Sequence, residues 1–302
     1  MSRIVVTGAG GFIGRACVSA LIKAGHEVAA CLRHVPSSED EFPTAEFVLI
    51  PDLARPGSML ETACHGAEAI IHLADNPDRA AGGAYPGRQF ADSVARAATV
   101  ASVPRIIHAS SIYARLDTEG QANAYGAAKR EAESVLSEIV GSDAVILRLP
   151  PVYGPCAKGG VAMLSDLVRR GLPLPFGSAK APRDYLALGN LTALLTALVE
   201  TSANDFAALA EAPHEPNDGA SIATADLASE LGRAMGKPAR LLPFPRGLLL
   251  ALASVAGKKD QLVAALDPLA AGSNNTLKQH TNWNPVADWT ANLAYLSEPQ
   301  SD

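Results

Sequence analysis

The sequence predicts an α/β protein in which a doubly wound parallel sheet is joined to a smaller, mostly helical C-terminal lobe. Strand and helix patterns alternate through the first half of the 302 residues. After Pro150, clusters of proline and glycine separate helical segments. Alternating strands and helices require crossover connections, which give a parallel sheet covered on both faces. We expect residues 1–150, with a contribution from 184–205, to form the sheet domain. Residues 151–183 and 206–302 are expected to form the substrate lobe.

Short apolar runs predict six strands, and helical periodicity predicts four helices between them. The expected strands are Ile4–Thr7, Glu27–Leu32, Phe47–Ile50, Ala69–Leu73, Arg105–Ala109 and Ala144–Leu149. The expected helices are Phe12–Ala24, Met59–Cys64, Val94–Ala101 and Ala124–Val140. Gly25 and Gly141 follow two of these helices, at the position where glycine commonly ends a helix. Pro150 and Pro151 end the last strand because proline cannot donate to a sheet.

Prolines and glycines cluster in the second half, between five further helical segments. These segments are Val161–Arg170, Leu188–Thr201, Thr224–Met235, Gly247–Ala256 and Trp289–Leu296. The longest apolar run extends from Gly247 to Gly257. It is shorter than the ~20 residues that span a bilayer, so it predicts a buried helix and no membrane partner.

Composition excludes several classes of protein. Hydrophobic residues make up 48% and charged residues 19%, which is typical of a chain with a large core. The net charge of -6 argues against a nucleic-acid surface.

The N-terminus begins with a strand pattern instead of a signal peptide, so a cytoplasmic location is expected. Cys17, Cys31, Cys64 and Cys156 are widely spaced and predict idle or buried thiols. The seven histidines show no ligand spacing, so no metal is expected, and His72 is interpreted as a core residue.

The sequence TGAGGFIG lies between the first strand and the first helix. Gly8 permits a tight turn, Gly11 lets the backbone approach a pyrophosphate, and Gly14 lets the helix pack close to the strand. The free N–H groups at Phe12 and Ile13 would bind the phosphates. The strand and helix flanks favour a dinucleotide site of Rossmann type over an unliganded glycine turn.

The end of the second strand is expected to select the cofactor. An NAD site carries Asp or Glu there, whereas this chain carries Arg33, which suits a 2′-phosphate. The sequence therefore favours NADP(H), with NAD(H) possible and a solvated surface arginine as the alternative interpretation. Asp52 and Leu53 follow the third strand and are expected near the adenine. Leu73 and Ala74 are expected beneath the dinucleotide.

Tyr125 and Lys129 are four residues apart and share one face of the long helix. A free tyrosine has a pKa near 10, so it is a poor base at neutral pH. A nearby ammonium group and an oxidised nicotinamide would both lower that pKa. The tyrosine could then exchange a proton with a carbonyl or hydroxyl oxygen. Ser110 and Ser111 follow the fifth strand and could bind the same oxygen. Tyr and Lys at this spacing are common in helices, so the glycine loop and the serines are what make the pattern specific.

The chain resembles the extended short-chain dehydrogenase/reductase family, which includes nucleotide-sugar epimerases, dehydratases and ketoreductases. The resemblance extends nearly from end to end. Its motifs are TGAGGFIG at 7–14, HLA at 72–74, SS at 110–111, YGAAKREAE at 125–133, RLPPVYGP at 148–155, PRDY at 182–185 and NWNP at 282–285.

The resemblance implies roles for individual residues. Ser111 would support proton transfer and contact substrate, Tyr125 would be the acid/base, and Lys129 would hold the ribose of the cofactor. It also implies that residues 150–153 lie against the nicotinamide, with Pro151 and Val152 contacting the cofactor and Tyr153 the substrate. Arg183 matches an arginine that commonly binds the substrate diphosphate.

Departures from the family pattern narrow the function. Family dehydratases carry Asp-Glu after the catalytic Ser or Thr, whereas Ile112 and Tyr113 follow Ser111 here. Family 4-epimerases usually carry an acid after the second strand, which is missing. These departures, together with Arg33, favour reduction over dehydration and epimerisation. Residues 153–177 and 237–253 look most like bacterial reductases of 4-keto-6-deoxy N-acetyl sugars on UDP, so the resemblance implies an enzyme that reduces a 4-keto-6-deoxy sugar nucleotide. A UDP-glucose 4-epimerase-like enzyme and a catalytically silent NADP sensor or scaffold remain as alternatives. The short stretch from Ser111 to Tyr125 indicates an altered substrate pocket.

A homodimer is also expected, because family members often associate through the helix that carries Tyr and Lys and the helix before it. Val94–Val100 and Val135–Val140 provide apolar positions at helical spacing. The alternative is that these positions simply face the sheet.

Overall fold

The structure is a computed structural model that describes residues 1–35, 44–75, 85–118, 124–255 and 259–297. The chain folds into two compact units. Unit 1 comprises Met1–Leu149, Leu191–Pro216 and Ser273–Asn284. Unit 2 comprises Pro150–Asn190, Asn217–Gly272 and Pro285–Asp302.

Unit 1 is built on a six-stranded sheet in which every neighbouring pair of strands is parallel. The strand order β3-β2-β1-β4-β5-β6 confirms the predicted doubly wound fold. The strands are β1 (Arg3–Thr7), β2 (Glu27–Leu32), β3 (Glu46–Leu49), β4 (Ala69–His72), β5 (Ile106–Ser111) and β6 (Ala144–Leu149). Because β1 lies beside β4, the order of the strands reverses at the glycine loop that follows β1. Open α/β sheets bind their ligands at such a point.

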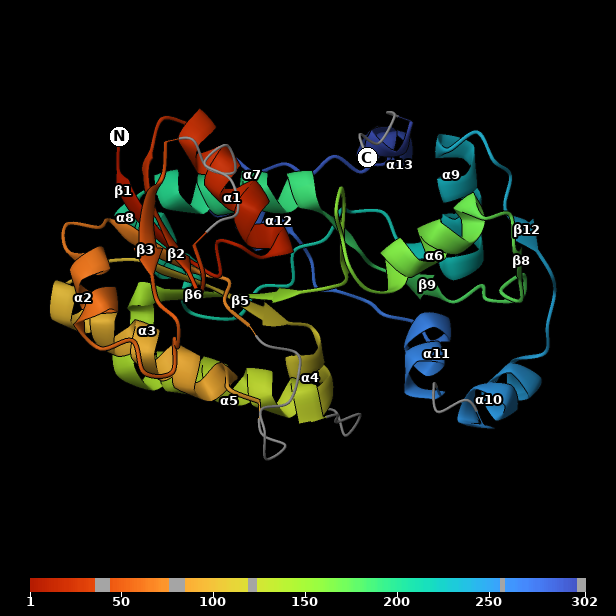
Figure 1. Ribbon diagram of the computed structural model, residues 1–302, viewed down its shortest axis with the longest axis horizontal. Coiled ribbons are helices and arrows are strands. Elements are labelled where there is room, and N and C mark those ends of the chain that lie inside the picture. The colour runs from red at the N-terminus through yellow and green to blue at the C-terminus, as the bar shows by residue number, and fades with distance from the viewer. Residues whose placement is uncertain (36–43, 76–84, 119–123, 256–258, 298–302) are drawn as a thin grey trace. The chain divides into compact units, whose positions relative to one another are not determined.

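Helices cover both faces of this sheet, and Figure 1 shows α2, α3 and α5 on one face with α1 and α7 on the other. The helices are α1 (Phe12–Lys23), α2 (Ser58–Cys64), α3 (Gly87–Ala101), α4 (Tyr113–Thr118), α5 (Ala124–Val140), α7 (Leu188–Glu200), α8 (Ala203–Leu209) and α12 (Asn275–His280). Val5, Ile70 and Ile106 are fully buried and belong to the core that packs beneath α2, α3 and α5. Successive strand residues point to opposite faces, so two hydrophobic layers hold the sheet in place.

The predicted helix ends are set by glycine. Gly25 adopts φ +88°, and its N–H donates to the Ile22 carbonyl at 2.9 Å, which ends α1. Gly141 adopts φ 54° directly after α5. Only glycine takes this left-handed conformation without steric cost, which explains why the two helices end where the sequence predicts.

Four elements of unit 1 differ most from the sequence prediction. Helix α3 begins at Gly87 instead of Val94. Its first two turns are rich in polar residues and lack an apolar period, so the sequence pattern did not reveal them. Strand β5 continues through Ser111, so both serines lie within the strand and not after it. Helices α4 and α8 have only six and seven residues, which is too short for periodicity to reveal them.

Unit 2 combines helices with three small pairs of strands. The helices are α6 (Gly160–Arg169), α9 (Thr224–Ala234), α10 (Arg246–Val255), α11 (Lys259–Leu266) and α13 (Trp289–Asn292). The strands are β7 (Val152–Tyr153), β8 (Pro173–Leu174), β9 (Pro182–Arg183), β10 (Leu186–Ala187), β11 (Ile222–Ala223) and β12 (Arg240–Leu241). Tyr153, Leu174 and Leu231 are fully or nearly fully buried in a core formed by α6 and α9.

Helix α10 corrects one prediction, since it is not uniformly buried. Leu249 is 8% exposed, whereas Leu248 is 50% exposed. The helix therefore packs one side against Ala179 and Leu266 and leaves another side open. Within the described residues, no helix is long and apolar enough to cross a membrane.

The cysteines differ in their exposure. Cys17, Cys31 and Cys64 are buried, and burial raises the pKa of each thiol to about 12. Cys156 is exposed. The three buried thiols therefore remain protonated at neutral pH and act as small apolar side chains.

Candidate active site

The glycine loop forms a tight cradle at the carboxyl end of β1. A Cβ on Gly8 would lie 2.6 Å from the Ala74 nitrogen, and Gly8 also needs its left-handed φ of +73°. A Cβ on Gly14 would lie 2.1 Å from the Gly8 carbonyl oxygen. Gly11 caps helix α1, and its N–H donates to that same carbonyl at 3.0 Å. Side chains are thus excluded from the loop, which fits a dinucleotide whose phosphates approach the N-terminus of α1 at Phe12 and Ile13.

The end of β2 carries no carboxylate. Leu32 is 8% exposed, and its Cδ2 atom would lie 3.2 Å from a Cβ built on Gly10. An apolar side chain therefore occupies the place beside the loop, while Arg33 is exposed directly after the strand. Asp52 is exposed beyond β3 and accepts a hydrogen bond from the Ala54 N–H at 2.9 Å. Leu53 beside it is buried.

The segment after β4 contacts the glycine loop. The Leu73 N–H donates to the Thr7 carbonyl at 3.1 Å, and Ala74 lies against Gly8. His72 is 1% exposed, and its Nδ1 atom is hydrogen-bonded to the Thr7 hydroxyl at 2.7 Å, as expected of a core histidine. Burial lowers the pKa of His72 to about 3, with a smaller contribution from the positive charge of Lys129. Its stacked neighbour His108 also has a lowered pKa, mainly because of burial.

The two serines of β5 point to different partners, because successive side chains in a strand alternate between faces. The Ser110 hydroxyl donates to Glu133 on α5, and Glu133 also accepts hydrogen bonds from Arg148 on β6 at 2.6 and 3.0 Å. This buried network joins α5 to the sheet. The Ser111 hydroxyl instead accepts from the Tyr113 N–H at 3.4 Å and is hydrogen-bonded to Tyr125.

Tyr125 and Lys129 meet a third residue, Asp75, which the sequence analysis did not single out. The Tyr125 hydroxyl donates to Asp75 Oδ2 at 3.3 Å, and the Lys129 ammonium lies 3.1 Å from the same oxygen. Lys129 also donates to the Ala109 carbonyl at 3.2 Å. The structure therefore brings Ser111, Tyr125 and Lys129 together at the carboxyl edge of the sheet.

Burial raises the pKa of Tyr125 well above its ordinary value, and the charge and hydrogen bond of Asp75 raise it further. The hydrogen bond with Ser111 acts in the opposite direction. Taken alone, the protein groups thus shift this pKa upward, whereas the sequence led us to expect a lowered value. Besides burial, the cause is the carboxylate, because a negative charge beside the phenol disfavours a second one.

Four predicted site residues lie in unit 2. Pro151 accepts a hydrogen bond from the Leu186 N–H at 3.2 Å, and Val152 begins the short strand β7. Tyr153 is fully buried and donates to Asp218 at 2.8 Å. Arg183 is 4% exposed and donates to the backbone carbonyl of Asp267. Tyr153 and Arg183, the two proposed substrate contacts in unit 2, therefore have partners within that unit.

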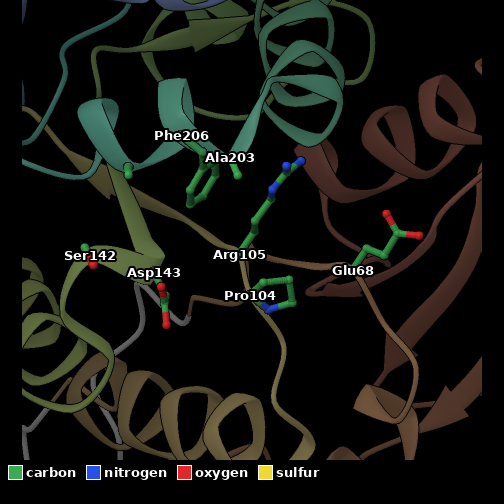
Figure 2. A pocket seen from close by; sticks show the side chains of 8 residues that line it. Glu68, Pro104, Arg105, Ser142, Asp143, Ala203 and Phe206 are labelled. Atoms are coloured by element: carbon green, nitrogen blue, oxygen red, sulfur yellow. The ribbon is translucent and has the colours of Figure 1, made fainter.

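A separate cavity of about 350 Å³ lies at the opposite edge of the sheet, where β4, β5 and β6 begin. Its lining residues are Glu68, Pro104, Arg105, Ser142, Asp143, Ala203, Phe206 and Ala207 (Figure 2). The Arg105 guanidinium group donates to the Val199 carbonyl at 2.5 Å and lies over the Phe206 ring at 5.6 Å. These partners give Arg105 a structural role, and none of the predicted site residues lines the cavity.

A doubly wound parallel sheet with a glycine cradle at its switch point and a Ser-Tyr-Lys cluster beside it defines an extended short-chain dehydrogenase/reductase. The model of the NAD dependent epimerase/dehydratase family matches residues 4–207, and the chain belongs to this family.

Known proteins resemble most of the chain. It is 28% identical over 303 residues to UDP-glucose 4-epimerase of Vibrio cholerae, covering 93% of this chain and 90% of the relative. It is 26% identical over 283 residues to ceramide reductase of Caulobacter vibrioides, covering 93% and 86%. Its fold is similar to the crystal structure of UDP-glucuronic acid 4-epimerase from Bacillus cereus in complex with NAD. That similarity has a TM-score of 0.73 and 18% identity, covering 97% and 94% of the two chains.

Proposed function

We propose that the protein is an NAD(P)-dependent oxidoreductase that reduces the 4-keto group of a nucleotide-activated 6-deoxy sugar. The observation that carries this proposal is the cluster of Ser111, Tyr125 and Lys129 at the carboxyl edge of the sheet, next to the glycine cradle. These residues provide a hydroxyl, a phenol and an ammonium group at one place. Such a set can bind a carbonyl oxygen and exchange a proton with it.

The dinucleotide would be held by the glycine cradle, with Phe12 and Ile13 at its phosphates and Lys129 at a ribose. Asp52, Leu53, Leu73 and Ala74 border the same edge of unit 1, and Pro151 and Val152 are proposed to contact the nicotinamide. When bound, this cofactor supplies the hydride. We favour NADPH because an apolar Leu32 ends β2 and an exposed Arg33 follows it. A guanidinium group pairs well with a phosphate, whereas leucine cannot accept a hydrogen bond from a ribose hydroxyl.

The protein side chains handle the proton. Tyr125 gives the proton to the substrate oxygen, Ser111 binds that oxygen, and Lys129 positions the phenol and the cofactor. Tyr153 and Arg183 are proposed to contact the sugar and the diphosphate. Because both are buried and partnered, a substrate would have to exchange for the existing contacts with Asp218 and the Asp267 carbonyl.

A 4-epimerase of a nucleotide sugar is the second candidate. It is favoured by the similarity to UDP-glucose 4-epimerase of Vibrio cholerae over almost the whole chain. The similarity to ceramide reductase of Caulobacter vibrioides favours ketone reduction instead. The two candidates differ in how they hold the cofactor, because an epimerase regenerates its NAD in each cycle and a reductase must exchange spent NADP.

The experiment that separates them is release of the bound dinucleotide. The purified protein is denatured, and the supernatant is analysed by chromatography and mass spectrometry. Stoichiometric NAD would favour the epimerase. An empty protein that binds NADPH and oxidises it in the presence of a UDP-4-keto-6-deoxy sugar would support the reductase. Binding of NADPH without turnover of either substrate class would indicate the silent sensor.

A homodimer through α3 and α5 is part of the proposal. Val94, Val135 and Leu136 are already buried inside unit 1, so they face the sheet or each other. The surface left for a partner includes Val100, which is 60% exposed. Light scattering at micromolar concentration tests this association, and a mass of one chain would contradict it.

A further inference from the structure

Asp75 follows strand β4 by three residues and lies at the carboxyl edge of the sheet, directly after the segment that packs on Gly8. Its side chain is 27% exposed, whereas the Lys129 side chain is 10% exposed. The same carboxylate oxygen, Oδ2, receives the Tyr125 hydroxyl at 3.3 Å and the Lys129 ammonium at 3.1 Å. A single acceptor therefore joins the two side chains that carry the proposed acid/base chemistry.

We propose that Asp75 is a positioning residue that fixes the Tyr125 phenol as a hydrogen-bond donor and pairs the buried Lys129, so that the site gives a proton to a substrate oxygen before it takes one. This inference rests on the proposed function, because it assigns Asp75 a role through Tyr125. It extends that function because it specifies that Tyr125 first donates a proton to the substrate oxygen.

The geometry explains why Tyr125 is expected to carry a proton and to donate it first. A carboxylate has no proton to donate at neutral pH, so the hydrogen bond between Tyr125 and Asp75 requires the phenol to carry its proton. Loss of that proton would leave a phenolate and a carboxylate at hydrogen-bond distance from each other, which is unfavourable. Lys129 lies too deep to be left without an anion at low cost, because a buried ammonium group needs a partner. Asp75 meets both requirements with one oxygen.

Among the described residues, the further groups beside Tyr125 come from three segments. Tyr85 precedes α3 and Tyr113 lies on α4, and their rings contact the Tyr125 ring edge-on at 6.0 and 6.3 Å. Ser111 comes from β5. Among the described residues, Asp75 is the carboxylate that accepts from the phenol, and the Lys129 ammonium lies 5.8 Å from the centre of the Tyr125 ring. Burial and Asp75 both raise the pKa of Tyr125, in line with the geometry.

The protonated phenol suits one of the two candidate reactions. In ketone reduction the carbonyl carbon receives a hydride and its oxygen takes the Tyr125 proton, and the resulting phenolate recovers a proton from water. In epimerisation the first step is removal of a proton from a sugar hydroxyl, for which the tyrosine must already be ionised. Asp75 therefore favours reduction, and the cost of ionising Tyr125 would slow an epimerase.

The direct test follows the ionisation of Tyr125 without any turnover. All six tyrosines are replaced biosynthetically by 3-fluorotyrosine, whose more acidic phenol titrates while the protein is folded. The signal of residue 125 is assigned in the ¹⁹F NMR spectrum by its loss in Tyr125→Phe. We expect its titration midpoint to fall by at least about one pH unit in Asp75→Asn, which is a tenfold change in proton affinity.

Matched variants keep the result interpretable. Asp92→Asn removes the same charge from an exposed position on α3, where Asp92 pairs with Arg96, and should leave the midpoint unchanged. Asp75→Glu restores the carboxylate and should move the midpoint back toward that of the unsubstituted protein. If Asp75→Asn does not fold because Lys129 is unpaired, Lys129→Met and Lys129→Met with Asp75→Asn are compared instead. An equal midpoint with and without Asp75 would overturn the proposal.

Kinetics distinguish failure of this inference from failure of the proposed function. If Asp75→Asn leaves the midpoint unchanged while Tyr125→Phe abolishes ketosugar reduction, the role of Asp75 is wrong and the proposed function stands. If the midpoint falls as expected but the unsubstituted protein does not reduce the ketosugar with either dinucleotide, the proposed function is wrong and the positioning of the phenol stands. With both correct, the pH at which kcat/KM declines on the alkaline side shifts downward in Asp75→Asn.

Discussion

Substitution of Gly14 by alanine tests the cradle on which the cofactor proposal depends. The new Cβ would lie 2.1 Å from the Gly8 carbonyl oxygen and 2.7 Å from the Ala9 Cα, whereas real Cβ atoms stay at least 3.0 Å from such neighbours. Both neighbours are backbone atoms of the loop, so they cannot rotate away as a flexible side chain could. The loop must retreat from α1 by nearly an ångström.

The magnitude follows from two opposing effects. Alanine in place of a helical glycine normally stabilises by about 0.5–1 kcal/mol, because it lowers the entropy of the unfolded chain. Overpacking against fixed backbone costs about 1–3 kcal/mol, occasionally more. The clash outweighs the entropic gain, so we expect Gly14→Ala to lower the free energy of unfolding by about 1–2 kcal/mol. Dinucleotide affinity should fall at least tenfold, since ~1.4 kcal/mol of lost binding energy is tenfold.

The assay combines urea unfolding with titration of NADPH and NADH by fluorescence. Gly189→Ala is the matched control, because Gly189 is exposed on α7 and a Cβ there would meet no atom within 4 Å. The control should keep its affinity and gain a few tenths of a kcal/mol in stability. A Gly14→Ala protein with the stability and cofactor affinity of the control would contradict the claim that the close packing at Gly14 shapes the dinucleotide site.

Three further predictions address the proton, the cofactor and acid stability. Tyr125→Phe should reduce turnover by about 10²–10⁴-fold with cofactor affinity kept, because only the proton donor is lost; a near-normal kcat would contradict this role. Arg33→Ala should weaken NADPH by roughly ten- to a hundredfold and NADH much less, and Leu32→Asp should reverse the preference. Equal loss for both dinucleotides would place the Arg33 side chain away from the 2′-phosphate. The unfolded chain binds a proton at His72 near pH 6.5 but the folded chain only near pH 3, so stability should fall as pH decreases between these values. This contribution amounts to about 1.4 kcal/mol per pH unit, and urea midpoints of His72→Asn should depend less steeply on pH; an unchanged slope would contradict it.

The fold, and the placement of Tyr125 and Lys129 on one face of α5, could be predicted because their signals are local. The six strands are short apolar runs, and the glycine loop is one contiguous motif whose flanks are a strand and a helix. Tyr125 and Lys129 lie one helical turn apart, so spacing alone placed them on one face. These features depend on residues that are neighbours in the sequence.

The features that could not be predicted depend on contacts between distant segments. Asp75 is fifty residues from Tyr125 in the chain, and they meet because the end of β4 and the start of α5 lie at the same edge of the sheet. A usable signal was present, since polar residues after parallel strands gather at the carboxyl edge. Glu133 could also have been found, because it continues the spacing of four from Tyr125 and Lys129.

Which of the two serines reaches Tyr125 depends on where strand β5 ends. From the sequence, Ser110 and Ser111 were expected after the strand, where either could face the substrate. Inclusion of both in β5 makes them point to opposite faces, so Ser110 bonds Glu133 and Ser111 bonds Tyr125. Strand ends are uncertain by a residue or two in sequence-based assignment, and here one residue decides which hydroxyl reaches the site.

The proposed reaction transfers a hydride to a nucleotide-bound ketosugar, with Tyr125 as the proton donor. The most direct measurement uses NADPH that carries deuterium at the transferable C4 position, together with a UDP-4-keto-6-deoxy-N-acetyl sugar, and determines the mass of the sugar product. We predict one deuterium per product molecule, formed in step with NADPH oxidation and absent with Tyr125→Phe. An unchanged ketosugar, together with epimerisation of a UDP-hexose without net loss of dinucleotide, would contradict it.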